Sequence, residues 1–120
     1  MITVKTLNFD AESREADVLL SDGQVEFTCF AYGLKSEEQA ELVPGDLWAF
    51  NPDNVQGIES AQSKAEKIPN SYYGYRFCGQ VINKNTVRVG EFDIHGFKNA
   101  MPGDVNPGEW VSFECMRVNF

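Results

Sequence analysis

The sequence is poor in the residues that enzymes and metal sites use most. It has one histidine, His95, and three cysteines, an odd number with no Cys-x-x-Cys spacing. A disulfide framework needs paired cysteines and a zinc site needs clustered ones, so this pattern favours buried free thiols. A Ser-His or Cys-His nucleophile would depend on His95 alone, and no metal-binding or phosphate-binding motif is present. We therefore expect a non-catalytic chain with no metal or cofactor.

Long apolar segments are also absent. No window approaches the stretch of about 18 apolar residues that a membrane-spanning helix needs. The first residues show no basic region followed by an apolar stretch, so no secretory signal is visible. We therefore expect a cytoplasmic protein that does not enter a membrane.

Basic residues are scarce. Ten Lys and Arg stand against 18 Asp and Glu, giving a formal net charge of −8. The imbalance belongs to residues 1–63, which hold twelve acids and three bases. An acidic surface repels phosphate backbones and attracts basic proteins. A basic protein is therefore the favoured partner, and nucleic acid is less favoured.

Aromatic and turn-forming residues are plentiful. The 120 residues include nine Phe, four Tyr, ten Gly and five Pro, which is typical of one domain built from many short strands. The Asp22-Gly23 turn predicts a hairpin between strands at 14–20 and 25–32. Aromatic and apolar residues then alternate along 73–81, which predicts a strand with one face in the core. Further strands are expected at 2–9, 46–50, 87–95 and 109–120.

Several of these strands change phase partway, so that their apolar residues switch from one face to the other. Val87 and Val89 are out of phase with Phe92 and Ile94, as expected of bulged strands that bend around a barrel. Capping-box patterns predict short helices at 36–42 and 60–67. Residues 51–71 otherwise read as a long polar connection. The expected fold is mainly β, a small closed or partly open β-barrel with one or two short helices.

The two halves of the chain match at a shift of 63 residues. Val18-Leu19 falls on Val81-Ile82, and Pro44-Gly45-Asp46 falls on Pro107-Gly108-Glu109. This predicts a single domain over 1–120 with repeated halves at 1–57 and 72–120, joined by a polar segment at 58–71. The glycine-acid turns that open the apolar strands at 43–48 and 107–111 resemble those of OB-fold and cradle-loop barrels. OB-fold barrels often bind oligonucleotides or oligosaccharides on one sheet face.

The charge pattern suggests a protein-binding module whose acidic face meets a basic partner, anchored by an exposed aromatic residue. Bacterial immunity proteins that neutralise basic toxins are similar in this respect. The two tryptophans follow the two Pro-Gly turns out of register, so one of them is expected to be exposed. The candidate partner-binding residues are Asp10, Glu12, Glu15, Asp17, Glu37, Glu38, Glu41 and Trp48.

The alternative is an OB-type binder of single-stranded nucleic acid or oligosaccharide. Aromatic rings beside arginine form stacking platforms for bases and sugars. The alternative ligand-binding residues are Tyr72, Arg76, Arg88 and Lys98. A third hypothesis is a small enzyme that uses His95, although alternation places this histidine on a solvated face. The sequence leaves open whether the chain is a monomer or a homodimer.

Overall fold

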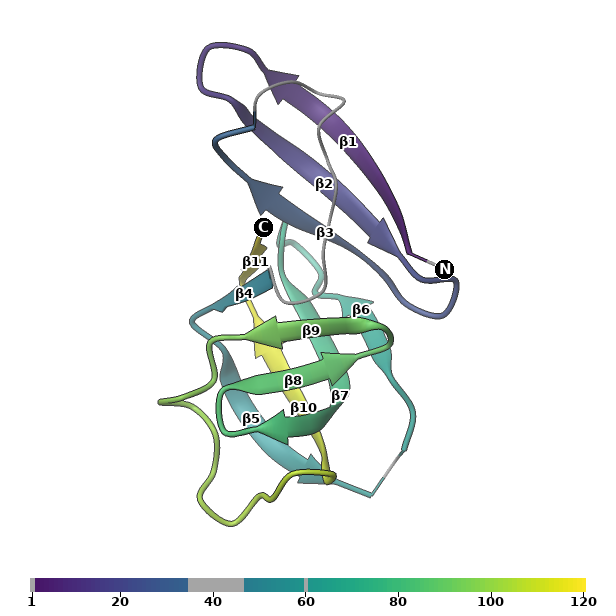
Figure 1. The fold of residues 1–120 in the computed structure, drawn as a ribbon, viewed down its shortest axis with the longest axis vertical. Helices are drawn as coiled ribbons and strands as arrows, with labels where there is room; N and C mark the ends of the chain where they lie inside the picture. The colour runs from purple at the N-terminus through teal and green to yellow at the C-terminus, as the bar shows by residue number, and fades with distance from the viewer. Residues whose placement is uncertain (1, 35–46, 60) are drawn as a thin grey trace.

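The computed structural model describes residues 2–34, 47–59 and 61–120, which form eleven β-strands and no helix (Figure 1). The described part of the chain therefore offers no helix that could span a membrane. The strands are β1 Thr3–Asp10, β2 Glu15–Ser21, β3 Glu26–Ala31, β4 Leu47–Phe50, β5 Asp53–Ile58, β6 Lys64–Lys67, β7 Tyr75–Asn83, β8 Thr86–Val89, β9 Phe92–His95, β10 Trp110–Cys115 and β11 Arg117–Asn119. The expectation of a mainly β protein is confirmed.

All eleven strands belong to one sheet. Its order is β1-β2-β3-β11-β4-β9-β8-β7-β10-β5, and β6 pairs with β7 beside this path. The path does not close between β1 and β5, so the predicted closed barrel is not confirmed. The sheet nevertheless bends back on itself. β4 pairs antiparallel with β11 in the middle of the path, and β5 pairs antiparallel with β10 at its end. Because β4 and β5 follow each other directly in the chain, the end of the sheet must lie close to its middle. In Figure 1, the β1 to β3 meander lies above the curled group formed by β4 to β11.

The predicted hairpin at Asp22-Gly23 is present as β2 and β3. Gly23 has a φ of 91°, a left-handed conformation that glycine adopts without steric cost. The Asp22 carboxylate accepts hydrogen bonds from the backbone N–H groups of Gln24 and Val25, both at 2.8 Å. It also accepts one from the N–H of Glu91 at 2.7 Å, which ties this turn to the connection between β8 and β9. One side chain thus joins two distant turns.

Three sequence predictions need correction. Residues 64–67 are strand β6, paired with β7, so the helix predicted at 60–67 is wrong. Its capping-box pattern is a local signal, and pairing with β7 overrides it.

The polar connection at 51–71 also contains β5, and its polar residues fit an exposed edge strand. The strand predicted at 87–95 is two strands, because Gly90, with a φ of 59°, turns the chain between β8 and β9. The helix predicted at 36–42 lies outside the described residues.

Other phase changes have the predicted cause. β1 carries a register shift between Leu7 and Asp10, where Asn8 has a φ of 52°. The closing strand is interrupted at Met116, which separates β10 from β11 and reverses the buried face. The duplication stays a prediction. Both halves contain a hairpin, but the first has four residues between its strands and the second has two.

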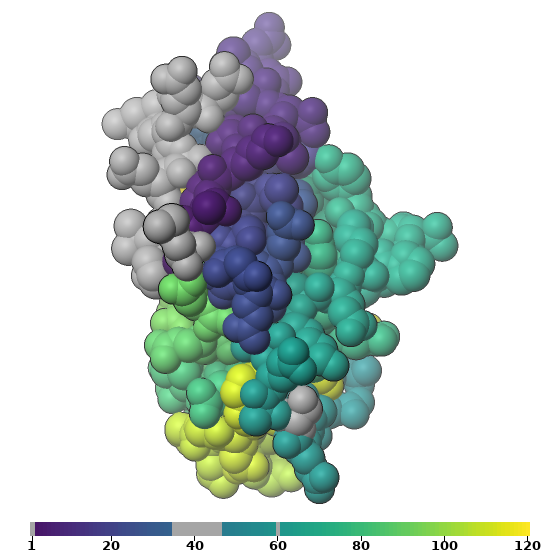
Figure 2. All heavy atoms as spheres, turned by 90° about the vertical axis from the view of Figure 1, so that its right-hand side faces the viewer, coloured from purple at the N-terminus to yellow at the C-terminus, as the bar shows by residue number. Residues whose placement is uncertain are grey.

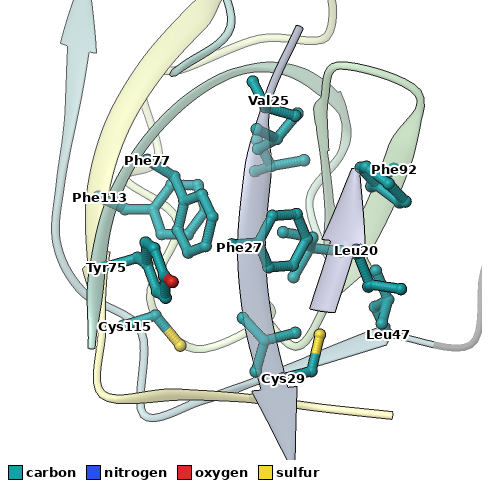
Figure 3. Packing of buried hydrophobic residues seen from close by; sticks show 14 of the residues in the cluster. Leu20, Val25, Phe27, Cys29, Leu47, Tyr75, Phe77, Phe92, Phe113 and Cys115 are labelled. Carbon is teal, nitrogen blue, oxygen red and sulfur yellow. The ribbon is translucent and has the colours of Figure 1, made fainter. Parts of the chain in front are cut away.

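The core is shared by the N-terminal meander and the rest of the sheet. Phe27 of β3 is fully buried, and its ring lies edge-on to Tyr75, Phe77 and Phe92 at centroid distances of 6.2, 5.2 and 5.3 Å. Figure 3 shows Phe27 at the centre of these side chains, with Leu20 beside it. From the side, the purple and blue atoms of β1 to β3 pack directly on the teal and green atoms below them (Figure 2). The two parts therefore stabilise each other.

Gly79 of β7 supports a direct test of this packing. A Cβ atom at Gly79 would lie 2.5 Å from the carbonyl oxygen of Arg88 and 2.8 Å from Cγ1 of Val87. We expect Gly79→Ala to lower the free energy of unfolding by about 2 kcal/mol, because the added methyl overpacks the contact between β7 and β8. Urea denaturation followed by tryptophan fluorescence measures this. Gly57→Ala is the matched control, since no atom lies within 4 Å of its Cβ position. Equal midpoints for the two variants would contradict the packing described.

Candidate binding face

A group of aromatic side chains lies on the outer side of the sheet where β3, β11 and β4 run side by side. We call five residues the aromatic face: Phe30, Tyr32, Trp48, Phe50 and Arg117. Tyr32, Trp48 and Phe50 are 65%, 52% and 46% exposed, an unusual exposure for rings of this size. Aromatic residues of β3 and β4 therefore flank Arg117 of β11, and together they form one partly exposed surface.

Strand register explains why these residues share one side. Phe30 of β3 is opposite Asn119 of β11, Asn119 is opposite Trp48 of β4, and Trp48 is opposite His95 of β9. On the other edge Phe30 is opposite Asp17 of β2. Residues opposite each other in a ladder point to the same side of a sheet. One row of side chains therefore crosses five strands.

Arg117 occupies the middle of the aromatic face. Its guanidinium carbon lies 4.8 Å from the ring centroid of Phe30 and 5.0 Å from that of Phe50. Arginine stacks on aromatic rings because its planar cation is attracted to their negative faces. Phe30 also stacks with Tyr32 at a centroid distance of 6.3 Å. The contacts hold the guanidinium in a fixed orientation.

Asp17 lies at the edge of this face and is 7% exposed. Its carboxylate accepts hydrogen bonds from the hydroxyls of Tyr72 and Tyr73 and, at 3.0 Å, from the Asn8 amide. Burial alone would raise the pKa of Asp17, but these three hydrogen bonds outweigh it and the pKa falls below its usual value. The pKa of Tyr73 is raised by burial and by its bond to Asp17, and that of Tyr72 is raised by the same carboxylate. The network fastens the segment before β7 onto β2.

The predicted acidic residues differ in their exposure to solvent. Asp10, Glu12 and Glu15 are exposed in and beside the connection between β1 and β2. The expectation that Asp17 is an exposed steering charge is wrong, because tyrosines from a segment distant in sequence cover it. Glu37, Glu38 and Glu41 lie outside the described residues.

An open pocket of about 230 Å³ lies between the exposed acids Asp10 and Glu15 and the aromatic face. Asp10, Glu15 and Asp17 contribute carboxylates to its lining, and Phe30 and Tyr73 contribute rings. Tyr73 contacts Phe30 edge-on at a centroid distance of 5.9 Å. The acidic and aromatic residues therefore form a continuous surface, and Trp48 lies on it as the predicted exposed tryptophan.

The alternative ligand-binding residues are arranged less favourably. Arg76 pairs with Glu114 at 2.8 Å, and Arg88 pairs with Asp93 at 2.7 Å. Tyr72 is occupied with Asp17, while Lys98 is exposed after β9. Arg76 and Arg88 are thus each already neutralised by a carboxylate.

His95 is partly buried rather than fully solvated. Its Nδ1 shares a hydrogen bond of 2.9 Å with the hydroxyl of Thr86, and its ring lies 5.4 Å from that of Trp48. All three cysteines are free thiols, with Cys29 and Cys115 buried. Burial raises the pKa of both thiols. Among the residues that the structure describes, no group of three or more His, Cys, Asp or Glu could hold a metal ion.

Sequence reasoning missed Tyr32, Phe50 and Arg117 as surface residues. Phe50 follows Trp48 by two positions in a strand, so period-two alternation already places both on one side. Arg117 had no comparable signal, because the break at Met116 decides its direction. The two flanking rings come from strands distant in the chain.

No protein family, curated protein or solved structure matches this chain at a significant level.

Proposed function

We propose that the chain is a non-catalytic binding protein that engages another protein through the aromatic face and the neighbouring acidic residues Asp10, Glu12 and Glu15. The observation that carries this proposal is the exposure of Tyr32, Trp48 and Phe50 around a clamped arginine, beside an acidic pocket. Trp, Tyr and Arg are the residues most enriched at binding hot spots.

The two parts of this surface would act at different stages of association. Exposed carboxylates on a chain of net charge −8 attract a basic partner over several ångströms and raise the association rate. The aromatic side chains would then exclude water and slow dissociation. Their strand positions and ring contacts limit the entropy lost on binding.

Binding of nucleic acid or oligosaccharide remains the second candidate, favoured by the stacked rings around Arg117. The net charge and the neutralised pairs of Arg76 and Arg88 count against a phosphate backbone. We also propose that β4 to β11 correspond to a partly open OB-like barrel, supported by the pairing of β4 with β11 and of β5 with β10. Three free thiols favour a cytoplasmic location.

The first experiment immobilises the chain and captures species from lysate of the native host at low and moderate salt. We expect a basic protein that is released as salt rises. Changing Asp10→Asn, Glu12→Gln and Glu15→Gln together should slow its association roughly tenfold at low salt. Trp48→Ala should instead speed its dissociation, since the lost ring contact acts after encounter.

The matched control removes three exposed charges elsewhere, by Glu59→Gln, Glu66→Gln and Asp104→Asn together. It has the same net charge as the acidic variant but leaves the binding surface intact. Equal slowing by both triple variants would show that only net charge matters. Capture of RNA or DNA in place of protein would overturn the proposal.

A further inference from the structure

Arg117 differs from the other arginines on strands in having no acid of its own. Arg76 and Arg88 each pair with a carboxylate, whereas no described carboxylate lies within salt-bridge distance of Arg117. Its Nε is enclosed and makes no hydrogen bond to a described residue. Guanidinium groups held in place normally satisfy their donors. The enclosed Nε cannot reach a ligand, so a partner from outside could pair only with the partly exposed remainder of the guanidinium, which no described carboxylate occupies.

The surroundings of Arg117 restrict what that partner can be. Phe30 and Phe50 lie against the guanidinium, so their rings leave its partly exposed edge for a ligand. A planar edge of N–H donors matches the two oxygens of a carboxylate or phosphate. Asn119, two residues along the same side of β11, also has an enclosed side-chain oxygen without a donor.

The charges nearby favour a singly charged anion. Asp17 lies opposite Phe30, and the pocket that also touches Phe30 carries Asp10 and Glu15. These carboxylates repel a phosphate, with its larger charge, more than a single carboxylate. We propose that Arg117 is the anchor for a carboxylate of the protein partner. This inference rests on the proposed function and adds that the partner, although basic overall, presents an acidic side chain or chain end at this point.

Nitrogen-15 NMR of the arginine side chains tests the anchor without the partner. The chain has four arginines, so few Nε–H signals arise, and Arg117→Lys assigns the relevant one by its loss. We expect sodium acetate to shift the Arg117 signal in a saturable manner. The Arg88 signal is an internal control and should move much less, because Asp93 already occupies that guanidinium. Propionamide, a neutral molecule of similar shape, should have no such effect.

Three results would overturn the inference: an Arg117 signal that does not respond to acetate, equal shifts with propionamide, or tighter binding of inorganic phosphate at matched ionic strength. With a captured partner, Arg117→Lys should weaken binding roughly tenfold, since a lysine keeps the charge but loses the paired geometry. If Trp48→Ala weakens partner binding while acetate leaves Arg117 unmoved, the proposed function stands and the carboxylate anchor fails.

Discussion

Phe27→Ala is expected to lower the free energy of unfolding by about 4 kcal/mol. The ring is fully buried between two parts of the chain, and truncation removes its contacts with Tyr75, Phe77 and Phe92 at once. The cavity would lie at the junction of the meander and the curled group, where the two halves of the core meet.

Chemical denaturation followed by circular dichroism measures this loss. Phe50→Ala is the matched control, because it makes the same chemical change on a ring that is 46% exposed. We expect it to cost about 1 kcal/mol or less. A Phe27→Ala variant no less stable than Phe50→Ala would show that the meander does not share the core.

Asp17→Ala is expected to cost about 3 kcal/mol. The substitution removes a carboxylate acceptor that is only 7% exposed, and it leaves three side-chain donors without their partner. It also frees the segment before β7 from β2. Glu15→Ala is the control, since it removes an exposed acid two residues away on the same strand. Similar losses for the two variants would contradict the network.

The pKa shift of Asp17 gives this network a pH signature. Its folded-state pKa is lowered below the usual value of an aspartate, so the stability it supplies is present above about pH 4. That stability is lost as the pH falls through the folded pKa. Asp17→Asn should therefore lose less stability than the wild type between about pH 5 and pH 2. Because the pKa of Asp22 is also lowered, the free energy of unfolding of both proteins should still fall at acid pH.

Tyr72 and Tyr73 make the free energy of unfolding depend on pH in the alkaline range. The pKa values of Tyr72 and Tyr73 are raised above 10.0, so their contribution is present below pH 10 and is lost as the pH rises further. Removing Asp17 should flatten this alkaline loss as well. Unfolding free energies measured across the pH range compare the acid and alkaline losses in one series, and parallel curves for wild type and Asp17→Asn would contradict the assignment.

Local signals in the sequence were sufficient for elements whose partners are near in the chain. The Asp22-Gly23 turn specified β2 and β3 because the turn itself fixes their pairing. The alternation along β7 placed Tyr75, Phe77 and Val81 in the core, as found. Tyr73 was assigned to that same face, yet it precedes β7 and turns to Asp17.

Features that depend on distant pairing could not be predicted in this way. The residues of β6 are polar and carry a helix-start pattern, and only β7 makes them a strand. Asp17 was predicted to belong to an acidic binding face, but it is buried, because tyrosines more than 50 residues away cover it. Arg117 could not be predicted as a binding residue, because its position on this surface depends on contacts with the rings of Phe30 on β3 and Phe50 on β4. The sequence alone therefore predicted only part of the proposed binding surface.

The aromatic face is assembled from β3, β4 and β11, three segments that are far apart in the chain. No fragment that lacks one of them can present it, so the surface exists only in the fully folded molecule. A partner that recognises it would bind the native state and ignore the unfolded one, which by mass action would raise the melting temperature of the whole chain.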